Sequence, residues 1–150
     1  MSLRMRSPLP SLDGVTDWIN GEPSADELTG KPVLVHFWSL SCYLCHDTAG
    51  MVVKWRDLYG PRGLVVIAVH QPRSADELDV ERVRSDALGA MGLTQHCAVD
   101  QRHTIVDRFE NQFVPAFYVF NRAHEMRHFK AGGQGLEVVA TAIERVLEEE

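Results

Sequence analysis

Apolar residues in the first half of the chain form two continuous runs separated by a segment with helical periodicity. The runs at residues 32–38 and 63–70 are rich in β-branched and aromatic side chains, which is typical of strands buried on both faces of a parallel sheet. Between them, apolar residues recur at helical spacing from Tyr43 to Tyr59, and Gly60 and Pro61 supply a stop. The pattern predicts a strand, a helix and a second, parallel strand.

The rest of the chain continues the alternation of helices and strands. Residues 1–30 are rich in Pro, Gly, Ser and Asp and predict an irregular arm that packs on the domain through Trp18. The domain then covers residues 31–150. Beyond residue 70 the expected elements are a helical segment at 74–91, a strand at 97–100, a helix at 104–110, strands at 116–120 and 126–130, and a helix at 136–149.

Composition and charge exclude two classes of partner. The chain has 150 residues, of which 45% are apolar, enough for one domain with a core of its own. Its net charge is -6 and its lysines and arginines do not cluster, so we expect no nucleic-acid partner. No apolar run approaches the roughly 20 residues of a membrane span, and no apolar signal segment follows Arg4 and Arg6. We therefore expect a cytoplasmic protein.

The candidate chemistry lies in a Cys-x-x-Cys pair, Cys42 and Cys45, between the first strand and the first helix. Three cysteines are too few for a secreted disulfide scaffold, which leaves a redox, metal-binding or catalytic use for the pair. The positive end of a helix dipole favours a thiolate at Cys42. Cys42 would attack a disulfide, and Cys45, one turn later, would resolve the mixed disulfide.

The segment around the cysteines, VHFWSLSCYLC at residues 35–45, resembles the active-site segment of the thioredoxin superfamily. Three further segments, VIAVHQP at 66–72, AVD at 98–100 and FVPA at 113–116, are similar to the TlpA-like branch, which includes the thioredoxin-like domains of NHL-repeat proteins. The resemblance covers about residues 30–148. It implies an α/β thioredoxin fold, with a central mixed β-sheet flanked by helices and a helical insertion between strands.

The resemblance also implies roles for individual residues. Pro115 takes the position of the family's cis-proline, which implies a cis Val114–Pro115 bond beside an extended substrate. The expected substrate groove consists of Trp38, Tyr43, Leu44, Val114 and Pro115. His36 aligns with the buried aspartate of thioredoxins and could transfer protons to and from Cys45. The chain departs from the family in its Tyr-Leu dipeptide between the cysteines and in Gly50, where a helix-kinking proline is expected.

Each of these residues also has another interpretation. The cysteine pair could be structural, could bind a metal, or with His46 could attach a c-type haem. His36 could be a core histidine with a hydrogen-bond partner, and Trp38 could simply fill the core. Cys97 is expected to be a small buried residue, with a regulatory thiol as the alternative. The remaining histidines show no ligand spacing and are expected on the surface or in loops: His70, His96, His103, His124 and His128.

The sequence therefore predicts a thiol-disulfide oxidoreductase that needs no cofactor and no metal. Its expected partners are proteins that carry disulfides or dithiols, together with an upstream reductase or oxidase. The main alternative is a thioredoxin-fold binding module whose cysteines are structural or vestigial. A peroxidase is less favoured because we find no Thr or Ser and Arg arranged around a single reactive cysteine.

Overall fold

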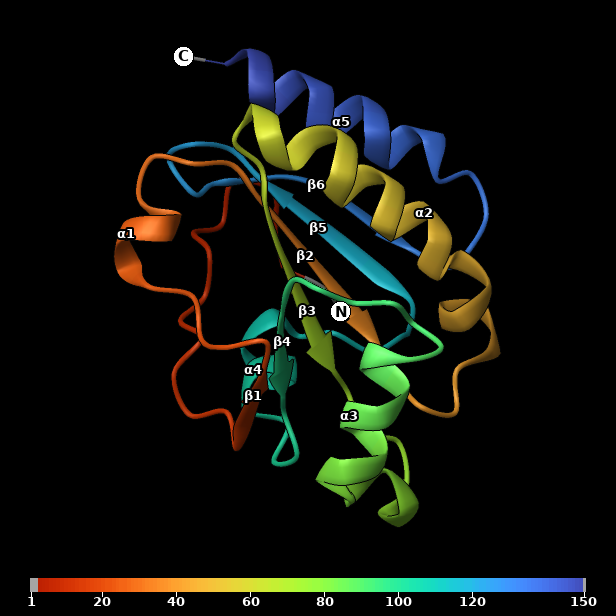
Figure 1. The fold of residues 1–150 in the computed structure, drawn as a ribbon. Helices are drawn as coiled ribbons and strands as arrows, with labels where there is room; N and C mark the ends of the chain where they lie inside the picture. The colour runs from red at the N-terminus through yellow and green to blue at the C-terminus, as the bar shows by residue number, and fades with distance from the viewer. Residues whose placement is uncertain (1–2, 150) are drawn as a thin grey trace.

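A six-stranded mixed sheet forms the centre of the computed structural model, which describes residues 3–149 (Figure 1). The strands lie in the order β1-β4-β3-β2-β5-β6. Strands β2, β3 and β4 are parallel, whereas β1, β5 and β6 run antiparallel to their neighbours. Their bounds are β1 Asp17–Ile19, β2 Val33–Trp38, β3 Val65–His70, β4 His96–Val99, β5 Ala116–Phe120 and β6 Met126–Ala131.

Helices cover both faces of this sheet. The α-helices are α1 Ala25–Leu28, α2 Tyr43–Tyr59, α3 Val80–Leu88, α4 Thr104–Phe109 and α5 Glu137–Glu148. Two 3-10 helices, η1 Gly60–Arg62 and η2 Ala75–Leu78, follow α2 and precede α3. Helices α2 and α5 lie side by side on one face, and α3 covers the same face farther along (Figure 1). Helix α4 and the N-terminal arm pack on the other face.

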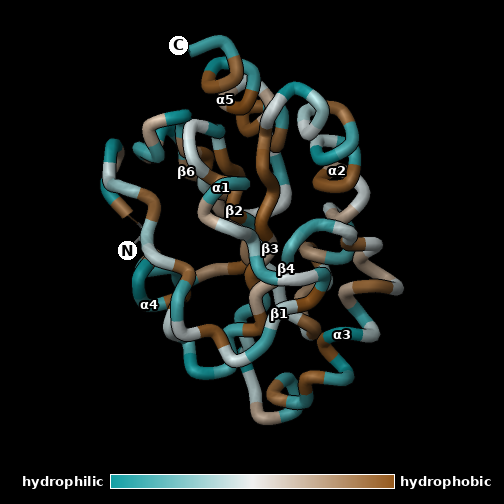
Figure 2. Tube along the Cα trace, turned by 60° about the vertical axis from the view of Figure 1, so that its left-hand side comes forward, coloured by the Kyte–Doolittle hydropathy of each residue, from teal (hydrophilic) through white to brown (hydrophobic). Residues whose placement is uncertain are grey.

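The burial of strand β2 on both faces accounts for the continuous apolar run in its sequence. All six of its residues are buried, because alternate side chains enter different cores. Leu34 packs among apolar residues of α2 and α5. Phe37 points the opposite way and meets Phe109 of α4 edge to face, with ring centroids 5.1 Å apart. Figure 2 shows the result: hydrophobic residues concentrate in the inner strands and hydrophilic ones in the outer loops. The parallel β-α-β unit is as predicted.

Two segments differ from the sequence prediction. The N-terminal arm is more regular than expected, because residues 17–19 form an edge strand with β4 and α1 begins with a Ser24–Glu27 capping box. Ile19 is fully buried, whereas Trp18 is only half-buried. The helical segment expected at 74–91 is divided into η2 and α3, because Asp79 adopts an extended backbone and caps α3. Within residues 3–149, no helix has the length and apolar character that crossing a membrane requires.

Candidate redox site

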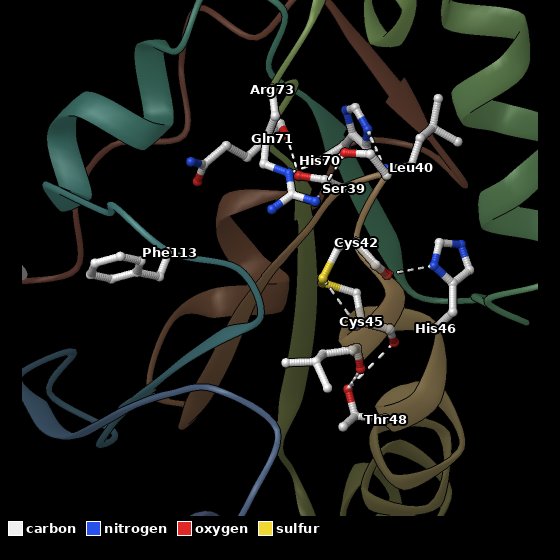
Figure 3. Close-up of a disulfide and its surroundings, with 12 residues drawn as sticks. Ser39, Leu40, Cys42, Cys45, His46, Thr48, His70, Gln71, Arg73 and Phe113 are labelled. Carbon is white, nitrogen blue, oxygen red and sulfur yellow. Dashed lines mark hydrogen bonds between the residues drawn. A yellow bond between two sulfur atoms is a disulfide. The ribbon is translucent and has the colours of Figure 1, made fainter.

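Cys42 and Cys45 form a disulfide at the start of α2, with their Cα atoms 5.2 Å apart (Figure 3). Cys42 is the N-cap of the helix, and the backbone N–H of Cys45 donates a hydrogen bond to Cys42 Sγ at 3.0 Å. An N-terminal backbone N–H that points at sulfur stabilises a negative charge there. When the disulfide is reduced, this position favours the thiolate of Cys42.

The four residues that lead into the helix, which we call the active-site turn (residues 39–42), are held by the end of β3 and by η2. The Ser39 hydroxyl donates to the carbonyl oxygen of Gln71, and the Leu40 N–H donates to His70 Nε2 at 3.2 Å. Ser41 donates to Glu77 through its N–H at 3.4 Å and its hydroxyl at 2.9 Å. The β3–α3 connection therefore fixes the backbone that carries Cys42.

Glu77 and His70 form the buried support of this turn. Burial alone would raise the pKa of Glu77, but hydrogen bonds from Ser41 and Arg73 lower that pKa on balance. Burial lowers the pKa of His70 to about 4, so its Nε2 is a neutral acceptor for the Leu40 N–H at neutral pH. The expectation of a surface or loop position for His70 is wrong. It ends β3 with no exposed surface and packs on Trp38, with ring centroids 4.9 Å apart.

Trp38 and Cys97 lie in the core beneath the disulfide. Trp38 is 1% exposed and packs with both cysteines of the disulfide, so it does not line a groove open to solvent. Cys97 is a free, fully buried thiol in the same cluster, as predicted. Burial raises the pKa of Cys97 to about 12, which keeps it protonated and unreactive.

His36 is buried in the middle of β2, with Gln95 as its partner. The Gln95 amide N–H donates to His36 Nε2 at 3.1 Å. Gln95 Oε1 accepts hydrogen bonds from Arg56 at 3.0 Å and from the Thr94 N–H at 3.2 Å, which fixes the orientation of the amide. Burial lowers the pKa of His36 to about 3, so the ring is neutral at physiological pH. These contacts favour the core-histidine interpretation over the proton carrier.

Exposed apolar side chains surround the disulfide. Tyr43 and Leu44, the two residues between the cysteines, are 80% and 46% exposed. The Val114–Pro115 peptide bond is cis, with Val114 half-buried and Pro115 buried. Phe113 is 65% exposed on the loop across from the disulfide (Figure 3). Sequence reasoning assigned no role to Phe113, although an aromatic residue two positions before the proline was the available signal.

Metal binding at the site finds no support in the arrangement of side chains. Within residues 3–149, no three or more His, Cys, Asp or Glu side chains come together as possible metal ligands. His46, the residue that would complete a haem attachment sequence, is instead bonded to the Cys42 carbonyl and to Asp86.

Comparisons with known proteins identify redox proteins as relatives, although no protein-family model matches the chain. The chain is 43% identical to the thiol-disulfide oxidoreductase YkuV of Bacillus subtilis over 148 residues, which is 98% of this chain and 99% of YkuV. It is 33% identical over 142 residues to protein DipZ of Mycobacterium tuberculosis, of which it spans only 20%. A solved thioredoxin-like protein in its oxidised form, 43% identical, superposes with a TM-score of 0.86 over 97% of both chains.

Proposed function

We propose separate roles for Cys42 and Cys45 on the premise that this chain belongs to the thioredoxin-like thiol-disulfide oxidoreductases, as its identity to YkuV over nearly its whole length establishes. Cys42 is the attacking thiol and Cys45 is the resolving thiol. The single observation that carries this assignment is the hydrogen bond from the Cys45 N–H to Cys42 Sγ at the start of α2. Only Cys42 occupies the N-cap position, where the helix stabilises a thiolate.

The reaction is a two-step exchange. In the reduced protein, the Cys42 thiolate attacks one sulfur of a substrate disulfide, forms a mixed disulfide and releases the other substrate sulfur as a thiolate. The Cys45 thiol then loses its proton and attacks Cys42 Sγ, which forms the Cys42–Cys45 disulfide and releases the second substrate thiolate. Two electrons pass from the protein to the substrate. The reverse sequence oxidises a substrate dithiol.

Selective alkylation tests which cysteine is the thiolate. In the reduced protein, we expect iodoacetamide to label Cys42 with a midpoint below the free-thiol pKa of about 8.5. Cys97 is an internal control because burial raises its pKa to about 12, so it should stay unlabelled until the protein unfolds. Peptide mass spectrometry across a pH series measures both. A Cys42 midpoint at or above that of a free thiol would contradict the assignment.

The proposal extends to the substrate groove and to protein disulfides and dithiols as substrates. Three exposed side chains lie on the two segments beside the disulfide, Tyr43 and Leu44 on α2 and Phe113 on the opposite loop (Figure 3). Val114 and Pro115 form the backbone beside them, where an extended segment of a substrate protein would lie. Apolar and aromatic side chains at such a surface are the ones that contribute most to protein recognition.

Replacing Phe113 should weaken the binding of protein substrates without affecting exchange with small disulfides. We expect Phe113→Ala to raise the KM for an unfolded disulfide-containing protein by about fivefold, the effect of losing roughly 1 kcal/mol of aromatic contact. Exchange with a small aromatic disulfide reagent should keep its rate. Leu58→Ala is the matched control, because Leu58 is 52% exposed at the other end of α2. Equal KM values for the two variants would place substrate binding elsewhere.

A further inference from the structure

His46, the first residue after the cysteine pair, forms hydrogen bonds to two different elements. Its Nδ1 lies 2.7 Å from the carbonyl oxygen of Cys42, and its Nε2 lies 2.6 Å from Asp86 Oδ2 on α3. The ring therefore links the Cys42 backbone to the helical insertion between β3 and β4. None of the roles proposed above for the site requires this residue.

Both contacts require a proton on the histidine. A carbonyl oxygen and a carboxylate oxygen only accept hydrogen bonds, so each ring nitrogen must donate one. The imidazole is therefore a cation in this arrangement. Burial alone would lower the pKa of His46, but the hydrogen bonds to the Cys42 carbonyl and to Asp86 raise it on balance. The side chain is 27% exposed, so solvent screens the charge only in part.

The cation lies closer to Cys42 than its counter-ion does. The Nδ1 edge of the ring bonds the Cys42 carbonyl, while Asp86 bonds the opposite edge. The charged groups nearby are few. On the other side of the active-site turn, Ser41 contacts both Glu77 and Arg73, and the Arg73 guanidinium donates to the Ser41 hydroxyl at 3.0 and 3.1 Å. His70 beside them is neutral at neutral pH, and Asp47 on α2 is exposed. The Glu77 carboxylate opposes a thiolate at Cys42, and the Arg73 cation beside it offsets part of that repulsion. The His46 cation, bonded to the Cys42 carbonyl, adds a second positive charge that favours the thiolate.

We propose that His46, held by Asp86, is a positioning residue that fixes the backbone of Cys42 and supplies a positive charge that stabilises its thiolate. This inference rests on the proposed function, since it assumes that Cys42 is the attacking thiol. Stabilising the thiolate stabilises the reduced protein, which makes the disulfide form a stronger oxidant. The helical insertion thus sets the redox equilibrium through Asp86 and His46.

The test compares His46→Gln with the unsubstituted protein in two measurements. We expect the midpoint of Cys42 alkylation to rise by about one pH unit. In glutathione buffers at a pH above both alkylation midpoints, the equilibrium constant for forming the Cys42–Cys45 disulfide should rise about tenfold, which is about 30 mV for this two-electron couple. A loss of packing alone would not raise both the alkylation midpoint of Cys42 and the equilibrium constant for disulfide formation.

A matched control exists within the chain. His96 makes the same pair of contacts, to the Gly21 carbonyl at 2.7 Å and to Glu27 at 2.8 Å, on a different element from the disulfide. His96→Gln should leave the Cys42 alkylation midpoint and the redox equilibrium unchanged. If His46→Gln and His96→Gln give the same values as the unsubstituted protein, the inference is overturned.

Asp86→Asn adds a test that depends on pH. Without the carboxylate, His46 loses its proton at a lower pH, while its ring stays in place. We expect this variant to match the unsubstituted protein near pH 5.5, where His46 is protonated in both. At the higher pH where only the unsubstituted protein keeps His46 protonated, the variant should match His46→Gln. A constant offset at both pH values would overturn the inference. If the unsubstituted protein itself forms no Cys42–Cys45 disulfide in any thiol buffer, the proposed function fails instead.

Discussion

Lowering the pH from 6.5 to 5 should reduce the free energy of unfolding by about 3 kcal/mol, through the two buried histidines His36 and His70. Burial lowers the pKa of His36 to about 3 and that of His70 to about 4. In the unfolded chain both titrate near 6.5. Below that pH the unfolded state binds protons that the folded state does not, so stability falls with a slope that approaches about 1.4 kcal/mol per pH unit for each histidine.

His128 adds to the loss in this window, because burial, Lys130 and Arg145 lower its pKa. Glu77 and His46 act outside the window. The pKa of Glu77 is lowered, so the stability that it contributes is present at pH 5 and is lost only under more acidic conditions. The pKa of His46 is raised, so its contribution is complete below pH 6.5 and is lost as the pH rises. Neither group accounts for a loss of stability between pH 6.5 and 5.

The His36→Asn variant isolates the contribution of His36. Asparagine does not titrate in this range, so the variant should lose only about 1.5 kcal/mol between pH 6.5 and 5, about half of the loss in the unsubstituted protein. Urea unfolding at a series of pH values gives the slope of the unfolding free energy against pH for each protein. The comparison of the two slopes holds even if the variant is less stable at every pH. Equal slopes of unfolding free energy against pH would mean that His36 titrates in the folded protein as it does in the unfolded chain, which would contradict its lowered pKa.

The elements that position the cysteines could be predicted from local pattern alone. The strand at 32–38, the helix at 43–59 and the strand at 63–70 differ from the observed β2, α2 and β3 by at most two residues at either end. These strands are buried on both faces, so their apolar runs are uninterrupted. The N-cap position of Cys42 follows from the predicted start of the helix at Tyr43.

The support of the active-site turn could not be predicted, because it depends on contacts between distant residues. His46 and Asp86 are 40 positions apart, and Ser41 and Glu77 are 36 positions apart. No local periodicity shows that a charged helical segment turns a buried glutamate toward a redox site. Strand β1 was missed for a related reason, since a three-residue edge strand is defined by its partner β4 rather than by its own pattern.

The roles of the two cysteines can be separated by trapping. In a Cys97→Ser background, Cys45→Ser leaves the attacking thiol without its resolving partner, so the first mixed disulfide should persist. Cys42→Ser removes the attacking thiol, so no mixed disulfide should form. Both variants should lose turnover with protein disulfides by roughly a thousandfold or more. Circular dichroism of each variant establishes that the loss is not one of folding.

The most direct test is the intact mass of each variant after it is mixed with a disulfide-containing protein. We expect a covalent adduct of Cys45→Ser that maps to Cys42 and disappears on addition of a reductant, and no adduct of Cys42→Ser. An adduct that forms equally with Cys42→Ser, or the absence of any adduct with Cys45→Ser, would contradict the assignment of Cys42 as the attacking thiol.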